Sequence, residues 1–144
     1  MVMIEQLIVS FVASAAFGIL FNSPPKLMLQ CGFVGMAGWF VYILCTDNNI
    51  GPIPASLAAS FVIAMMSHLF AKLYRTPIIV FNVAGVIPLV PGGIAYDAMR
   101  NIVEDQYDQA IQLAFKASMI SGAIAIGIIF SEVLHQVMRR RVKG

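Results

Sequence analysis

Long apolar runs are the feature that most restricts how this chain can fold. Runs of this kind cover roughly residues 4–21, 28–45 and 53–74, close to the length of about 20 residues that an α-helix needs to cross a bilayer. The segments "NSPPKL" and "TDNNIGP" between them are rich in residues that end helices. Another run, over roughly 111–137, leads into a basic tail at 138–144. The pattern predicts an all-α integral membrane protein.

The composition indicates the same class. Hydrophobic residues make up 60% of the chain and charged residues 11%, and the mean hydropathy is +0.86. A small soluble globule of this composition would expose too much apolar surface, so we expect a single transmembrane domain over 1–144 in a lipid bilayer. The net charge of +2 is too small to indicate nucleic acid binding. The sequence has no catalytic triad pattern, phosphate loop or metal-spaced cluster, so we expect no enzyme, no metal site and no cofactor.

Two further features fit a membrane domain without adding a site. Cys31 and Cys45 lie in the same apolar run, far apart and without the close spacing of zinc ligands, so we expect them to be packing residues. The N-terminal run carries Glu5 where a signal peptide would carry positive charge, so we interpret it as a retained helix.

The segment 77–91 is apolar but short. Its residues would cover about 22 Å of a hydrocarbon core about 30 Å thick, so it either crosses the bilayer or re-enters. If it crosses, Lys26, Lys72, Arg75 and the tail at 138–144 all share one face, as expected for cytoplasmic loops. We therefore expect about five transmembrane helices in the cell (inner) membrane, with the N-terminus outside and the C-terminus cytoplasmic.

The fourth of these helices is interrupted by Pro88, Pro91, Gly92 and Gly93. The prolines lack N–H groups, and the glycines permit a sharp turn. The following stretch "IAYDAMRNIVED" predicts an amphipathic helix. Its first N–H groups would point back into the break and could hold a carboxylate, as in the discontinuous helices of transporters. The alternative is a simple helix exit with no binding role.

The stretch "IPLVPGGIAYDAM", preceded by "TPIIVFNVAGV" and placed after three apolar helices, resembles the threonine/serine exporter family. It is most similar to the short, stand-alone form of that family's second membrane half, and the match is most specific over 77–99. The resemblance implies a secondary exporter of small hydrophilic metabolites, either serine/threonine-like amino acids or a dicarboxylate such as succinate. It also implies a larger partner subunit in the membrane. Four residues fall on the family's proline-glycine motif and a tyrosine lies just beyond it: Pro88, Pro91, Gly92, Gly93 and Tyr96.

Other polar residues have two interpretations each. Asn82 could bind substrate or cap an exposed carbonyl, and Asp97 could favour a helix N-terminus or take part in coupling. His68 lies in line with the small residues Ser56, Ser60 and Ala64, so it could exchange protons or donate a hydrogen bond to a neighbouring helix.

Two residues near the basic tail complete the set of candidates. Glu132 and His135 are three residues apart and could form an interfacial pair or a proton relay.

A non-transporting assembly or scaffold subunit is the competing functional class, in which the proline-glycine turn only shapes a docking surface. One short bundle without an internal repeat does not readily supply both walls of an alternating-access route. The sequence therefore predicts assembly, either with the larger subunit or as a homo-oligomer.

Overall fold

The computed structural model describes residues 2–144 and confirms the all-α class, with no strand in that part of the chain. Within it, four helices are long and apolar enough to cross a membrane. They are α1 (Val2–Leu20), α2 (Met28–Asp47, after the short 3-10 turn η1, Pro25–Leu27), α3 (Pro52–Tyr74) and α6 (Tyr107–Val142).

The predicted broken element is also present. It consists of α4 (Ile79–Val86), the 3-10 turn η2 (Ile87–Leu89) and α5 (Gly92–Val103). The two parts are bent by 52° and together count as a fifth candidate span. Val90 leaves the helix with ψ 127° because the ring of Pro91 disfavours the helical conformation of the residue before it.

Two details of the sequence prediction are wrong. The turn lies at Val90 and Pro91, whereas Gly92 and Gly93 begin α5, and no glycine among residues 2–144 has a positive φ. The last helix is also longer than 111–137, because it continues through the basic tail, whose arginines are good helix formers. Its 36 residues reach about 54 Å, well beyond one hydrocarbon core.

Four of the helices end in the same way. After α1, α2, α3 and α5 a non-glycine residue takes the left-handed conformation: Asn22, Asn49, Arg75 and Asp105. The next residue then donates its N–H to a carbonyl five residues earlier, as in the Ser23 to Gly18 bond of 2.9 Å. Three of these residues are Asn or Asp, which tolerate this conformation better than other side chains. The "TDNNIGP" and "EDQYDQ" segments therefore form tight helix-to-helix turns.

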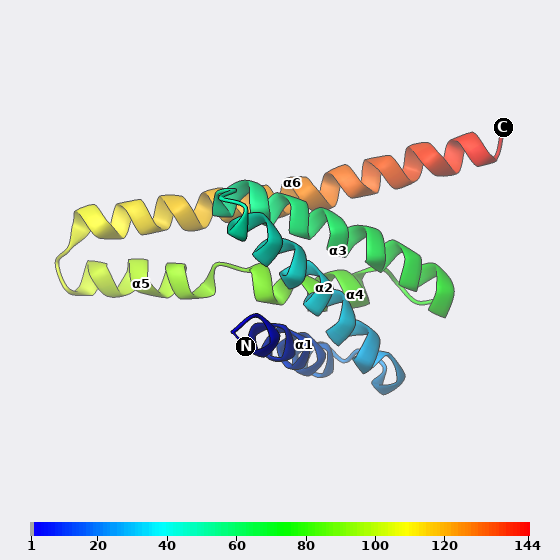
Figure 1. Ribbon diagram of the computed structural model, residues 1–144, viewed down its shortest axis with the longest axis horizontal. Helices are drawn as coiled ribbons and strands as arrows, with labels where there is room; N and C mark the ends of the chain where they lie inside the picture. The colour runs from blue at the N-terminus through cyan, green and yellow to red at the C-terminus, as the bar shows by residue number, and fades with distance from the viewer. Residues whose placement is uncertain (1) are drawn as a thin grey trace.

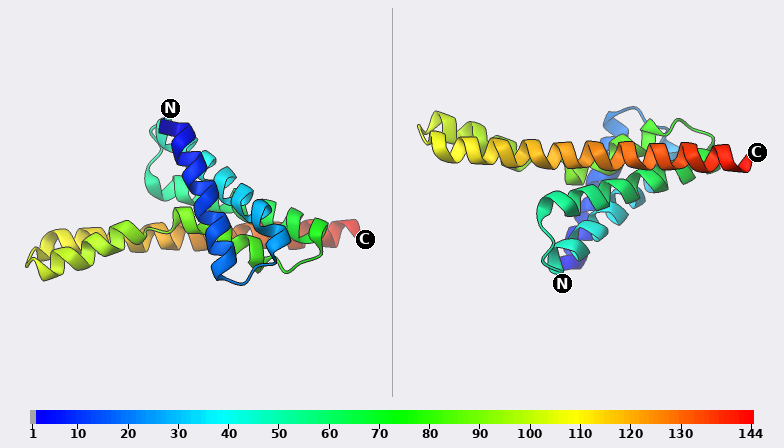
Figure 2. Two further views of the ribbon diagram at one scale, coloured as in Figure 1. Left: turned by 90° about the horizontal axis from the view of Figure 1, so that it is seen from below. Right: turned by 90° about the horizontal axis from the view of Figure 1, so that it is seen from above.

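The helices divide into a bundle and a projecting hairpin (Figure 1). α2 packs between α1 and α3, and the short α4 contacts all three. Val34, Ile63 and Phe81 are fully buried where these helices meet. α5 contacts chiefly α6, and the two form an antiparallel hairpin that extends beyond the bundle before α6 returns along α3 (Figure 2).

The charged loops are separated along the long axis of the molecule. Figure 1 shows that the α1–α2 and α3–α4 connections lie toward the same end as the C-terminus. Lys26 and Arg75 lie in these connections, Lys72 lies in the last turn of α3, and further arginines lie in the tail; we call this the basic end. The acidic α5–α6 turn lies at the opposite end, and the start of α1 and the α2–α3 loop lie near the middle of this axis.

Small side chains let the helices approach closely. Ser56, Ser60 and Ala64 on α3 are buried, as the sequence predicts. α6 crosses this line at Gly127, where an added Cβ would lie 2.6 Å from the carbonyl oxygen of Leu57. Lipid offers no hydrophobic drive for helix association, so this close contact supplies much of the attraction between α3 and α6.

The α3–α6 crossing gives a stability prediction. We expect Gly127→Val to destabilise the chain by about 1–3 kcal/mol, because the backbone of α3 obstructs the new side chain. Gly122→Val on the same helix meets nothing within 4 Å and is the matched control. Thermal unfolding of both variants in mild detergent tests this. Equal melting temperatures would contradict the crossing.

Candidate functional site

The break in the fourth span lines a cavity of about 220 Å³, which we call the break cavity. Pro88, Pro91 and Gly93 lie on one side of it. The other side comes from distant parts of the chain, with residues of α2, α3 and α6: Trp39, Tyr42, Ser56 and Ile120. Irregular backbone at membrane depth is tolerated where it is buried in protein or lines a cavity, and this backbone lines one.

The backbone at the start of α5 is only partly hydrogen-bonded. The N–H of Gly92 donates to Val90 at 2.8 Å and that of Ala95 to Pro91 at 3.0 Å. Between them, the N–H groups of Gly93 and Ile94 find no acceptor within residues 2–144, and Pro91 offers no side chain to cap them. Both residues line the break cavity, so free donors and the positive end of the helix dipole belong to its wall.

Two further cavities adjoin the break cavity through shared lining residues. One, of about 430 Å³, lies beside α1 and includes Glu5, Gln6 and Pro88; the other, of about 510 Å³, includes Gln6 and Asp47. Trp39 lines all three cavities. Its indole N–H donates to the Gln6 side-chain oxygen at 3.4 Å, and its ring stacks on Tyr42 with centroids 4.9 Å apart.

The three cavities share an electrostatic character. The charged side chains in their linings are Glu5 and Asp47, and no Lys, Arg or His of the described chain lines any of them. The unpaired N–H groups at the start of α5 are therefore their main positive feature. An anionic group fits at the α5 end, and a cationic group fits toward the carboxylates.

The sequence candidates do not all meet at this site. Gly92 adjoins the break cavity but is exposed and does not line it. Asn82, in the first turn of α4, is half-buried, lies outside the cavity linings, and has a buried side-chain oxygen with no partner within residues 2–144. Tyr96 and Asp97 are exposed on α5. The substrate-binding roles of all these residues stay predictions.

Sequence reasoning missed the α1 and α2 side of the site. Trp39 is the single tryptophan of the chain and lies three residues before Tyr42, a spacing that places both on one helix face. That pair, within an apolar run, was the available signal. Its contact with a segment some fifty residues later depends on helix packing, which the local pattern does not encode.

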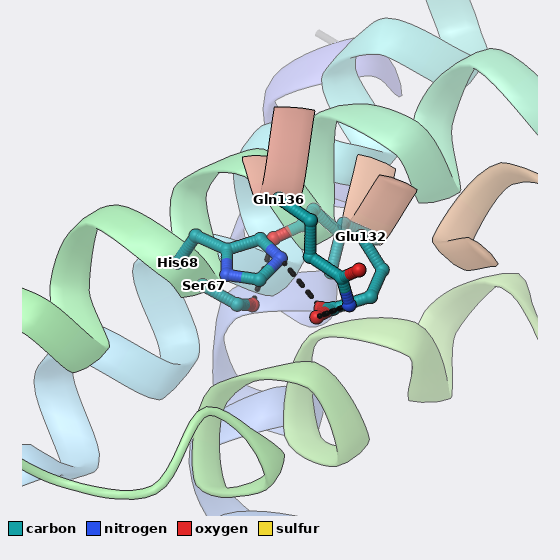
Figure 3. Close-up of polar contacts among 5 residues, drawn as sticks. Ser67, His68, Glu132 and Gln136 are labelled. Carbon is teal, nitrogen blue, oxygen red and sulfur yellow. Dashed lines mark hydrogen bonds and ion pairs between the residues drawn. The ribbon is translucent and has the colours of Figure 1, made fainter. Parts of the chain in front are cut away.

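The remaining candidates form one cluster between α3 and α6. His68 Nε2 lies 3.0 Å from Glu132 Oε2, and the ring of His135 stacks on that of His68 with centroids 4.1 Å apart. Gln136 donates to the other carboxylate oxygen of Glu132 at 3.1 Å (Figure 3). Within residues 2–144, Glu132 thus pairs with His68 across the helices and not with His135, whose ring stacks on that of His68.

Comparisons with known proteins place the chain in a family. The family model described as "Threonine/Serine exporter, ThrE" matches residues 6–134. An uncharacterized protein of Haemophilus influenzae is 26% identical over 140 residues, covering 92% of this chain and 47% of that protein, so the chain spans about half the length of this curated relative. No solved structure matches the chain. The matched region contains the broken span and every lining residue of the break cavity, and the chain belongs to the threonine/serine exporter family.

Proposed function

We propose that this chain is a membrane subunit of a secondary exporter for small zwitterionic amino acids of the serine/threonine kind, and that substrate binds in the break cavity. Membership of the exporter family supports a transporter, as distinct from an enzyme. The observation that carries the proposal is the pair of unpaired N–H groups at Gly93 and Ile94 in the wall of a small cavity. At about 220 Å³ it is smaller than the roughly 300–1,000 Å³ typical of drug-sized ligands, which suits a small metabolite.

Charge favours an amino acid over a dicarboxylate such as succinate. The substrate carboxylate would accept hydrogen bonds from the start of α5, as anions do at helix N-termini. Its ammonium would face the cavities that hold Glu5 and Asp47. A second carboxylate would meet these two acids with no cationic side chain in the lining, which would cost binding free energy.

A second polypeptide would complete the substrate's path across the membrane. The α5–α6 hairpin leaves large apolar side chains exposed on both helices, including Tyr96, Met99, Val103, Ile111 and Phe115. In a bilayer such side chains face either lipid or a second membrane protein. Because this chain spans about half of its relative, we propose that a larger membrane subunit covers the hairpin. A homo-oligomer or a scaffold role is the competing outcome.

The His68, Glu132 and His135 cluster has a separate role in this proposal. Both carboxylate oxygens of Glu132 are already paired, and the cluster shares no lining residue with the three cavities. We therefore assign it to holding α3 against α6, in preference to a proton relay.

The two glycines at the start of α5 provide a matched test of the substrate site. Neither position has a neighbour within 4 Å of an added Cβ, so valine at either should be tolerated by the fold. Gly93→Val should place a branched side chain beside the free N–H groups in the cavity wall and reduce serine or threonine efflux from loaded cells by at least about tenfold, with abundance unchanged. Gly92→Val should keep most of the efflux, because Gly92 lies outside the lining.

Measuring partner co-purification on the same samples distinguishes a substrate-binding role from a scaffold role. A scaffold subunit would lose partner co-purification in proportion to efflux, whereas a blocked substrate site leaves co-purification intact. If both glycine variants export at the wild-type rate, the break cavity is not the substrate site.

The charge argument predicts substrate selectivity. In vesicles that contain this chain with its partner, counterflow should accumulate labelled serine and threonine but not succinate. Glu5→Gln should raise the amino acid KM on the order of tenfold through loss of a charge-assisted contact. Glu104→Gln, which removes an acid from the α5–α6 turn outside the cavities, should leave KM near wild type. Succinate counterflow equal to that of serine would contradict the proposal.

In the proposed orientation, the basic end lies on the cytoplasmic side of the cell (inner) membrane. In a Cys45→Ala background, single cysteines at Asn48 and Gln106 should react with an impermeant reagent added outside intact cells. A cysteine at Gly144 should react only after permeabilisation. Cys31 is fully buried and needs no replacement. Labelling of positions 106 and 144 from the same side would show that α4 and α5 do not cross the membrane together.

A further inference from the structure

A further cavity, lined by cations where two of the three described above are lined by acids, lies at the basic end. It has a volume of about 530 Å³ and is formed where the last turns of α3 and α6 lie beside each other. Lys72, Arg139 and Lys143 line it together with the stacked rings of His68 and His135. We propose that this cavity, called here the basic cavity, binds the phosphate headgroup of an anionic phospholipid.

The three cations of the basic cavity lack acidic partners. The ion pairs found within residues 2–144 are His68–Glu132 and Arg100–Glu104, so Lys72, Arg139 and Lys143 pair with no carboxylate there. The other six acidic residues of the chain lie in α1, at the end of α2 or in the α5–α6 hairpin. The basic cavity therefore keeps an uncompensated positive charge.

The seventh acidic residue, Glu132, is held outside the basic cavity by its hydrogen bonds. Glu132 does not line the cavity, and its two oxygens accept from His68 at 3.0 Å and from Gln136 at 3.1 Å. The stack of His68 on His135 fixes one wall of the site. An incoming phosphate would thus meet cations on a preformed surface and no carboxylate in the lining.

The apolar part of the lining favours a lipid over a soluble anion. Met138 and Val142 also line the cavity and are 48% and 87% exposed. They lie on the same helix turns as the cations, at the end of two helices long enough to span a membrane. A phospholipid presents a phosphate beside acyl chains at this boundary, and basic pockets between transmembrane helices bind such headgroups.

The inference can be tested with short-chain lipids on the chain purified from membranes in mild detergent. Binding of dihexanoyl phosphatidylglycerol, measured by native mass spectrometry, should exceed that of dihexanoyl phosphatidylethanolamine. The triple variant Lys72→Gln/Arg139→Gln/Lys143→Gln should weaken phosphatidylglycerol binding by about 100-fold, because each cation near a headgroup contributes about fivefold. Gel filtration of the variant checks that it remains folded.

A second triple variant controls for general surface charge. Lys26→Gln/Arg140→Gln/Arg141→Gln also removes three positive charges from the basic end, but from outside the cavity lining. It should keep phosphatidylglycerol binding within a fewfold of wild type. Equal losses in the two triple variants, equal binding of the two lipids, or competition by glycerol phosphate at the same concentration as the lipid would overturn the proposal. The last result would assign the cavity to a soluble phosphate.

Discussion

Backbone that leaves a helix inside a bilayer must find hydrogen-bond partners or a polar cavity, and the rest of this structure is arranged around one such place. η2 is enclosed by α1, α2 and α3. Their close approach depends on small residues, since an added Cβ at Gly35 would meet the side chain of Ser14 and one at Gly85 would meet Val34 and Ile63. The small residues thus bring the helices together around η2, and the prolines of the broken span supply the irregular backbone there.

The fold could be predicted from the sequence where local chemistry decides it. Apolar runs set four spans, Pro88 and Pro91 set the break, and the polar residues of "IAYDAMRNIVED" set the amphipathic α5. The prediction failed where two local signals compete. Gly92 and Gly93 could form a turn or begin a helix, and the fixed φ of Pro91 with the restriction on Val90 already makes the turn one step earlier.

The site was less predictable because it is assembled from distant segments. The break identifies Pro88, Pro91 and Gly93, but their partners Trp39 and Ser56 are chosen by how α2 and α3 cross α4. The same limit applied to Glu132, whose nearest sequence partner was His135 and whose actual partner is His68 on another helix. Spacing along one helix predicts which residues share a face, but not which helix that face meets.

The glycines differ in what surrounds them. Those inside the bundle each lie against a neighbour: Gly18, Gly32, Gly35, Gly38, Gly85 and Gly127. Gly92, Gly93 and Gly122 have none within 4 Å, and all three lie on α5 or α6, where Gly93 lines the break cavity. Bare backbone at these positions lets another backbone or a ligand approach closely, which larger residues would prevent. If the proposed larger subunit packs against Gly93, it would contact the break cavity and bring substrate binding and assembly to the same surface.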